Sequence, residues 1–377
     1  MPILVFCDII EVMDNVSKTF HSGRAVFSLM VFICIIAAGA VLKFTASVVL
    51  PFTVAVLLAF VMYPLMKSLD KIRCPRAVSI LLIVVIIISG LYLFGVILFT
   101  SGKVVIDQYP KYENRFTEIY NWASSLLGLP NDVELSFWQN LWGQQLIRTW
   151  VRDFTFTLSN TSLRFISNAV LVVIFVVFLL LEAGFFKLKL EAAFHSKLNR
   201  INQMGHDLIS QVTRYLAAKF LISLANAVIF IIAFNLVGLE FAIVWGAIQF
   251  IMNFIPTLGS IVTGVAISLF ALLQFWPDPA PVIIVVIIVF AVNMILGNMI
   301  DPKIIGDNVG ISPLVILISL ALWGYIWGFA GMILAVPMTV IVKIACENIP
   351  ILEPVSILIG SKRAVLAKIS ESEKRES

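Results

Sequence analysis

The stretch NFIPTLGSIVTG, residues 253–264, interrupts an apolar block that runs from Phe241 to Trp276. A second apolar block, Ser312 to Lys343, is interrupted by WGYIWGFAG, residues 323–331. Because roughly 20 apolar residues cross a bilayer as a helix, each block is too long for one crossing and is broken near its middle. Backbone that leaves the helix at membrane depth is tolerated only where protein or a water-filled cavity covers it. Two such breaks at matching positions in a chain indicate the binding site of a transporter.

The composition excludes a soluble globular protein, because 60% of the 377 residues are hydrophobic and only 13% are charged. We therefore expect an all-α polytopic integral membrane protein surrounded by lipid. The net charge of +4 is spread over loops and forms no basic patch, so no nucleic-acid partner is expected. The four cysteines include no CxxC pair and predict no disulfide framework. We also expect no metal site and no cofactor.

Apolar and charged runs divide the chain into segments. A basic turn at 67–76 carries four basic residues against one acidic residue, and short loops rich in Lys and Arg stay in the cytoplasm. Both termini are therefore expected to be cytoplasmic. The expected segments are a cytoplasmic N-terminal segment (1–25), three membrane spans (26–100), an extracytoplasmic helical insert (101–164), a fourth span (165–186), a cytoplasmic amphipathic helix (187–214), a transport core (215–343) and a cytoplasmic tail (344–377).

The transport core alternates an ordinary span with a broken block, twice. If each block is a re-entrant hairpin that enters and leaves by one face, the two halves have opposite orientations and form an inverted repeat. Gly324, Gly328 and Gly331 make a poor continuous helix, which favours hairpins. The expected architecture is about six full spans plus two broken re-entrant helical hairpins. If both blocks instead cross fully as kinked helices, the count becomes eight spans and the C-terminus still lies inside.

Polar groups at the breaks and in their partner spans are the candidates for binding a solute or an ion. Freed backbone amides near Thr257 to Ser260 would offer donors to an oxygen-rich solute, and freed carbonyls near Gly324 to Gly331 could hold a cation. Polar side chains in lipid also serve simply as interhelical hydrogen bonds. The predicted site residues are Asn253, Pro256, Thr257, Gly259, Ser260, Asn293, Asn298, Asp301, Gly324, Gly328 and Gly331, and a wider set adds Asn226, Gln249, Thr263, Ser312 and Thr339.

Asp301 is the candidate for ion coupling. A carboxylate inside a membrane is costly enough to be a functional hypothesis by default, and a carrier of protons or sodium ions needs one. Asp301 also ends a predicted span, with Pro302 and Lys303 following it. An interfacial structural carboxylate is therefore an equal alternative.

Motifs of other protein classes are absent from the sequence. There is no G-x4-GK[ST] loop for ATP, and no HExxH motif for zinc. The three histidines, His21, His195 and His206, lie outside the predicted spans, which excludes an intramembrane zinc protease. We therefore do not expect an enzyme. A passive oligomeric channel remains open beside a transporter.

Two motifs resemble the signature of the autoinducer-2 exporter family of bacterial permeases: NFIPTLGSIVTG at 253–264, and NMIDPKIIGDNVGISPLVILISLALWGYIWGFAGMILAVP at 298–337. The resemblance covers roughly residues 25–345. It implies a homo-oligomeric, multi-pass transporter of the bacterial inner membrane, with some members linked to export of a small quorum-sensing furanone and others to sodium/proton exchange. The resulting expectation is a secondary transporter that moves a small polar solute by alternating access, coupled to a proton or sodium gradient. A sodium/proton antiporter and a passive oligomeric channel are the alternatives.

Overall fold

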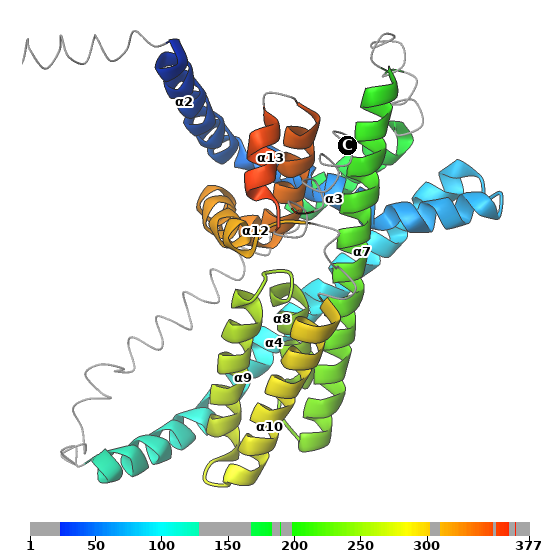
Figure 1. Cartoon of the computed structure of the whole chain (residues 1–377). Coiled ribbons are helices and arrows are strands. Elements are labelled where there is room, and N and C mark those ends of the chain that lie inside the picture. The colour runs from blue at the N-terminus through cyan, green and yellow to red at the C-terminus, as the bar shows by residue number, and fades with distance from the viewer. Residues whose placement is uncertain are drawn as a thin grey trace, which may run out of the picture. The chain divides into compact units, whose positions relative to one another are not determined.

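The computed structural model describes residues 23–127, 167–182, 189, 198–301, 310–349, 352–361 and 366. Within these ranges the chain is helical apart from short turns and one isolated bridge between Ile311 and Gly360. The helices are α2 (Gly23–Phe44), α3 (Ala46–Lys71), α4 (Arg76–Leu127), a short helix at Ser167–Glu182, α7 (Leu198–Val237), α8 (Ala242–Met252), α9 (Leu258–Phe275), α10 (Pro279–Val292), the π-helix η1 (Asn293–Ile300), α12 (Pro313–Asn348) and α13 (Glu353–Ile359) (Figure 1).

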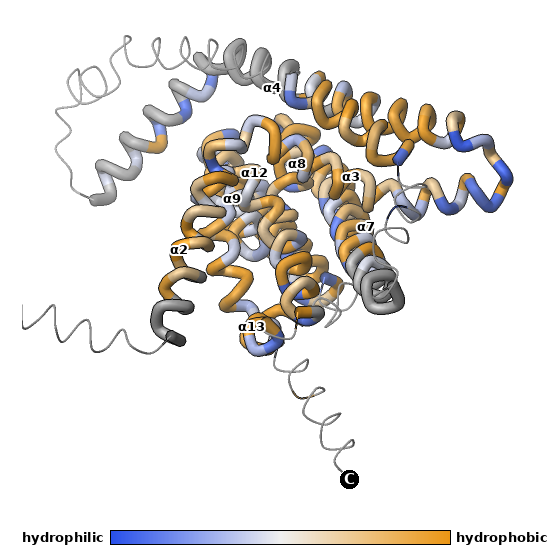
Figure 2. Tube along the Cα trace, turned by 90° about the horizontal axis from the view of Figure 1, so that it is seen from above, coloured by the Kyte–Doolittle hydropathy of each residue, from blue (hydrophilic) through white to orange (hydrophobic). Residues whose placement is uncertain are grey.

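Six of the described helices are long and apolar enough to cross a membrane, which confirms the predicted all-α polytopic membrane protein. Figure 2 shows apolar residues dominating these helices and hydrophilic residues gathered at the turn between α3 and α4. Three further apolar helices are shorter: Phe32–Phe44, Ser167–Glu182 and Ala242–Met252. The six long segments are Ala46–Lys71, Arg76–Ile97, Ile209–Val237, Leu258–Phe275, Pro279–Ile300 and Pro313–Glu347.

The chain divides into two compact units, Met1–Leu50 and Pro51–Ser377. The first unit contains α2, and the predicted first span falls on this helix. At the end of α2 the Thr45 hydroxyl donates to the Val41 carbonyl oxygen at 2.6 Å, which satisfies one of the helix's last acceptors. All packing described below lies within the second unit.

One apolar core of the second unit joins α3, the apolar part of α4 and the helix Ser167–Glu182. Ala55, Ile83 and Val176 are fully buried at its centre. The Arg76 guanidinium donates to the Leu180 carbonyl oxygen at 3.2 Å, so the start of α4 is tied to the end of the short helix. These helices lie within the segments predicted as the second, third and fourth spans, and that each of them crosses the membrane stays a prediction.

A second apolar core joins α7, α9 and α10. Phe230 and Phe234 stack on successive turns of α7 with ring centroids 5.0 Å apart, and both side chains are fully buried. Ile267 of α9 and Val285 of α10 are also fully buried against this core. This packing holds α9 and α10 against α7.

Two helices are longer than predicted. α4 is one helix of 52 residues, so the predicted boundary at 100/101 between span and insert lies inside it. α7 is one helix of 40 residues, and the boundary at 214/215 likewise lies inside it. Neither boundary carries a proline, so nothing there forces the helix to stop and the backbone continues. The lipid boundaries of these segments stay a prediction.

Both broken blocks fold back on themselves as helical hairpins. In the first, α8 and α9 are joined by residues 253–257, and Thr257 has a φ of +62°. In the second, α12 is interrupted at Gly328, whose backbone (φ 63°, ψ −142°) is not helical. Ser319 and Thr339 bond through their hydroxyls although 20 residues separate them, a distance of about 30 Å along a continuous helix. Whether these hairpins are re-entrant in a membrane, and form an inverted repeat, stays a prediction.

Candidate functional site

Polar side chains from α7, α8, α9 and η1, most of them buried, meet inside the otherwise apolar packing, and we call them the polar layer. No charged residue occurs in the sequences of α8, α9, α10 or η1, so every charge in this region comes from elsewhere. The members of the polar layer are Lys219, Ser223 and Asn226 of α7, Gln249 of α8, Asn253 after it, Thr263 of α9, and Asn293 and Asp301 at the two ends of η1.

Gln249 links the first hairpin to η1. Its side chain is fully buried, and its Nε2 donates to Asn293 Oδ1 at 3.2 Å. The Thr263 hydroxyl lies within bonding distance of Gln249 Oε1 and also of the Gly259 carbonyl oxygen, at 2.8 Å. Its single proton serves one of these acceptors at a time. The triad of Gln249, Thr263 and Asn293 therefore ties α8, α9 and η1 together.

Asn253 links the tip of the same hairpin to α7. Its Nδ2 donates to Ser223 Oγ at 2.9 Å, and both side chains are buried. Asn226, one turn beyond Ser223, is 1% exposed, and its Oδ1 has no hydrogen-bond partner among the described residues. A buried acceptor of this kind costs about 1–3 kcal/mol unless a donor reaches it. The polar layer therefore has hydrogen-bonding capacity beyond its internal bonds.

Lys219 and Asp301 form an ion pair within the polar layer. Lys219 Nζ lies 2.7 Å from Asp301 Oδ2, and the side chains are 4% and 19% exposed. Asp301 Oδ1 is buried, and no described residue bonds to it. Removing two charges from water is expensive, and taking away one partner leaves a buried charge uncompensated. The pair is thus a site where charge must stay balanced.

Lys219 is a member of the polar layer that the sequence did not lead us to predict. A signal for it was present, since RYLAAKFLISL at 214–224 places a lysine inside a span whose remaining residues up to Val237 are uncharged. A basic residue in a span is as much a functional hypothesis as an acidic one. Asp301 ends η1 and points its carboxylate at Lys219 of α7, and its role in ion coupling stays a prediction.

Asn293 and Asn298 lie in η1, which continues α10, and Asp301 ends it. The backbone changes from α-helical to π-helical geometry at Asn293. π-helical turns are rare and occur often at functional sites. The change leaves Asn298 exposed, whereas Asn293 and Asp301 face the polar layer. Two of these three predicted residues, Asn293 and Asp301, therefore bond to other members of the polar layer.

The turn of the first hairpin uses its own backbone amides. The Leu258 amide donates to the Pro256 carbonyl oxygen at 2.6 Å, and the Gly259 amide donates to the Ile255 carbonyl oxygen at 3.1 Å. These amides are therefore engaged within the turn, although the sequence predicted donors for a solute here. Thr257 is exposed at the tip, and Pro256 and Ser260 are half-buried.

The glycines of the second hairpin serve its packing and its turn. A Cβ atom at Gly331 would lie 1.9 Å from the Trp323 carbonyl oxygen, and one at Gly324 would lie 2.9 Å from Met332 Cγ. Gly328 supplies the positive φ of the turn and has open space around it. α12 packs against α7, the helix that carries Lys219.

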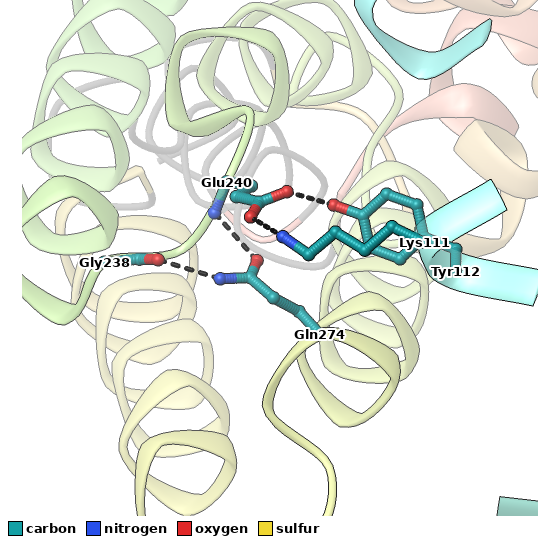
Figure 3. A network of polar contacts seen from close by, with 5 residues as sticks. All are labelled: Lys111, Tyr112, Gly238, Glu240 and Gln274. Atoms are coloured by element: carbon teal, nitrogen blue, oxygen red, sulfur yellow. Dashed lines mark hydrogen bonds and ion pairs between the residues drawn. The ribbon is translucent and has the colours of Figure 1, made fainter. Parts of the chain in front are cut away.

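A second polar cluster lies where α7 passes into α8, and we call it the Glu240 network (Figure 3). Lys111 and Tyr112 of α4 both donate to the Glu240 carboxylate. Gln274 of α9 accepts from the Glu240 amide at 2.8 Å and donates to the Gly238 carbonyl oxygen at 2.8 Å. The sequence did not predict this network, because its partners lie far apart in the chain.

Electrostatics in the Glu240 network favour the charged carboxylate. Partial burial acts to raise the pKa of Glu240, but the hydrogen bonds from Lys111 and Tyr112 and the Lys111 charge outweigh it and hold that pKa below its usual range. Burial, and then the bond to the Glu240 carboxylate, raise the pKa of Tyr112. The network is therefore a carboxylate held by an ammonium and a neutral phenol at ordinary pH. The described residues contain no cluster of three or more His, Cys, Asp or Glu side chains that could hold a metal ion.

Comparison with known proteins gives one consistent result. A family model described as AI-2E family transporter matches residues 31–351. A protein of Borreliella burgdorferi named as a candidate transport protein is 30% identical over 318 residues, which cover 82% of this chain and 83% of that protein. The AI-2 transport protein TqsA of Escherichia coli (strain K12) is 26% identical over 331 residues, which cover 87% of this chain and 93% of TqsA.

Proposed function

We propose, from the premise that this chain belongs to the AI-2E transporter family, that it is a secondary transporter which exports a small polar solute resembling autoinducer-2. The chain is a multi-span membrane protein of a bacterial transporter family. The name of TqsA supports a solute of the autoinducer-2 type. We assign the chain no enzymatic activity, and we place both termini in the cytoplasm and the multi-span chain in the inner membrane.

The observation that carries the proposal is the polar layer. A set of interhelical bonds that served only stability would satisfy its own buried atoms. Here Asn226 Oδ1 and Asp301 Oδ1 are buried acceptors that no described residue satisfies. A small solute with hydroxyl groups would supply the donors that these atoms lack. The described backbone of the first hairpin and η1 would form the walls of its site.

The Lys219–Asp301 pair supports coupling to an ion. A proton or a sodium ion that binds Asp301 changes the net charge of a buried pair, and a buried net charge is unfavourable. The pair must then rearrange, so ion occupancy and the position of η1 against α7 are linked. In this proposal Asp301 takes the coupling ion, and Lys219 balances the carboxylate when that ion has left.

The two hairpins support alternating access. We propose that each is re-entrant, that the two halves of the core have opposite orientations, and that the solute reaches the polar layer from one side of the membrane at a time. The family resemblance supports assembly as a homo-oligomer.

Two other functions compete with this proposal. One is sodium/proton exchange without an organic solute, for which the Lys219–Asp301 pair alone would suffice. The other is a passive oligomeric channel.

Counterflow in proteoliposomes tests the proposed function. Vesicles loaded with unlabelled autoinducer-2 should accumulate labelled autoinducer-2 transiently from outside, because a carrier exchanges solute across the membrane. A channel would let the label equilibrate without accumulation. A chain that exchanges only sodium for protons would move no label, yet would acidify or alkalinise the vesicle lumen in response to a sodium gradient. Either of these results would contradict solute export by a carrier.

A further inference from the structure

Glu240 is held in two different ways on its two sides. Its backbone is fixed to the first hairpin, because Gln274 of α9 bonds both to the Glu240 amide and to the Gly238 carbonyl oxygen, each at 2.8 Å. Its carboxylate reaches the other way, to Lys111 and Tyr112 of α4 (Figure 3). The backbone of Glu240 is therefore attached to α7, α8 and α9, and its side chain holds α4.

The described contacts of α4 with the first hairpin are made by side chains at a few points. Tyr112 packs on Phe270 with ring centroids 5.5 Å apart, and Trp122 packs on Trp276 with centroids 5.0 Å apart. The ion pair beside them is partly open to solvent, with the Lys111 side chain 52% exposed and that of Glu240 29% exposed. Exposed ion pairs contribute little and are screened by salt.

The packing of α7, α8 and α9 with one another is of a different kind. These helices share the fully buried Phe230, Phe234 and Ile267, and they share the Gln249 triad of the polar layer. Separating them would expose an apolar core and break buried hydrogen bonds, whereas the contacts with α4 that the described side chains make are half-exposed. The surface at which the first hairpin can part from a neighbour is therefore the one it shares with α4.

We propose that Glu240 is a positioning residue for transport: its carboxylate latches the first hairpin to α4, and this latch opens once in each transport cycle. The contacts described above support the latch itself, whereas its opening in each transport cycle depends on the proposed function. When the latch opens, the first hairpin would move together with α7 as one rigid body, and the hydrogen bonds of Gln274 would stay intact. The long continuous α4 would be the fixed partner.

Distances between spin labels test the latch without any ligand. In a cysteine-free background, labels at Ser125 of α4 and Leu236 of α7 span the proposed surface, and both positions are exposed. Labels at Leu236 and Leu269 lie on α7 and α9 and serve as the pair within one body. We expect Glu240→Gln to raise the ratio of long to short distances across the surface about fivefold, which corresponds to roughly 1 kcal/mol. The pair within the body should not change.

The matched control is Glu118→Gln. Glu118 pairs with Arg115 on the same helix at 3.1 Å, so this control removes an exposed ion pair without touching the hairpin. Its distance distributions should equal those of the parent. If Glu240→Gln leaves the Ser125–Leu236 distribution unchanged, or if it broadens the Leu236–Leu269 distribution equally, the latch is refuted.

A reversible cross-link tests whether opening belongs to the cycle. Cysteines in place of Lys111 and Glu240, joined by a bifunctional methanethiosulfonate reagent that spans the length of the two original side chains, should stop the flux of labelled autoinducer-2, and reduction should restore it. Each single cysteine variant, treated with the same reagent, gives the flux against which the cross-linked variant is compared, and reduction should not change it. Undiminished flux with the cross-link formed would overturn the proposal. Absence of flux in the parent would instead refute the proposed function, and the spin-label distances would still decide the latch.

Discussion

Gly259 lies so close to Met252 that a Cβ atom at position 259 would come within 1.7 Å of the Met252 carbonyl oxygen. The second hairpin has the same relationship between Gly331 and the Trp323 carbonyl oxygen, at 1.9 Å. In each hairpin a glycine lets the returning helix approach the backbone of the first. The two broken blocks therefore share one packing device, although their sequences differ.

The close backbone approach at these two glycines predicts that Gly259→Ala and Gly331→Ala each lower the melting temperature of the purified protein. The added methyl group meets backbone, which cannot move aside as a flexible side chain can, so we expect a loss of about 1–3 kcal/mol. Gly90→Ala is the control, because Gly90 lies within α4 and a Cβ atom there would have nothing within 4 Å of it. That change should be neutral or stabilise the helix slightly. Equal melting temperatures for all three variants would contradict the close approach of the two helices at Gly259 and Gly331.

The Gln249 triad makes a second prediction. Thr263→Val removes the hydroxyl while keeping nearly the same shape, and leaves the buried Gln249 Oε1 without its donor. We expect a loss of about 1–3 kcal/mol of stability and a fall in flux. Thr263→Ser keeps the hydroxyl and should restore both. The idea fails if the serine variant is no better than the valine variant in thermal unfolding.

The Glu240 network predicts where pH should have no effect. The folded pKa of Glu240 is lowered, so its contribution is present above the usual carboxyl pKa of about 4.3 and is lost as pH falls through the lower folded value. The folded pKa of Tyr112 is raised, so its contribution is present below about pH 10 and is lost as pH rises through the folded value. The Ser125–Leu236 distance should therefore be constant between about pH 5 and 9. A transition near neutral pH would show that another group controls this contact.

Orientation in the membrane is predicted by the basic turn at 67–76 and the charge-balanced insert at 101–164. Single cysteines at Asn131, which lies outside the described residues, and at Asn199, near the start of α7, should react with an impermeant thiol reagent from opposite sides. Asn131 should be labelled in intact cells, and Asn199 only after the membrane is opened. Labelling of both from one face would contradict the assigned topology.

The hairpins could be predicted from the sequence because their cause is local. Pro256, Gly259 and the glycines at 324, 328 and 331 are clustered where each apolar block is too long for one crossing, and the structure folds back at both places, whereas Pro51 and Pro64 lie inside the continuous α3. The continuity of α4 and α7 was harder to predict, since the sequence marks where apolar character ends and a helix does not have to end there.

The pairings could not be predicted, because they depend on tertiary contacts. Lys219 and Asp301 are 82 residues apart, and Tyr112 and Glu240 are 128 residues apart. No local pattern encodes which helices meet. From the sequence alone, Asp301→Asn keeps nearly the same shape and removes only the charge, so folding should survive. The structure shows that this variant would also leave the Lys219 ammonium buried without its partner. A loss of gradient-dependent flux in the single variant therefore has two explanations, impaired folding and lost ion coupling.

The double variant Lys219→Gln with Asp301→Asn removes both charges together and keeps the buried site neutral. Because no uncompensated charge remains, we expect it to fold and insert, and to retain exchange of labelled autoinducer-2 at equal concentrations on both sides. A coupled carrier needs a charge that changes between the two halves of its cycle. The deciding measurement is flux in proteoliposomes with and without an imposed pH or sodium gradient. We predict that the gradient stimulates the parent and leaves the double variant unaffected, and a double variant as gradient-dependent as the parent would contradict the assignment of coupling to Asp301 and Lys219.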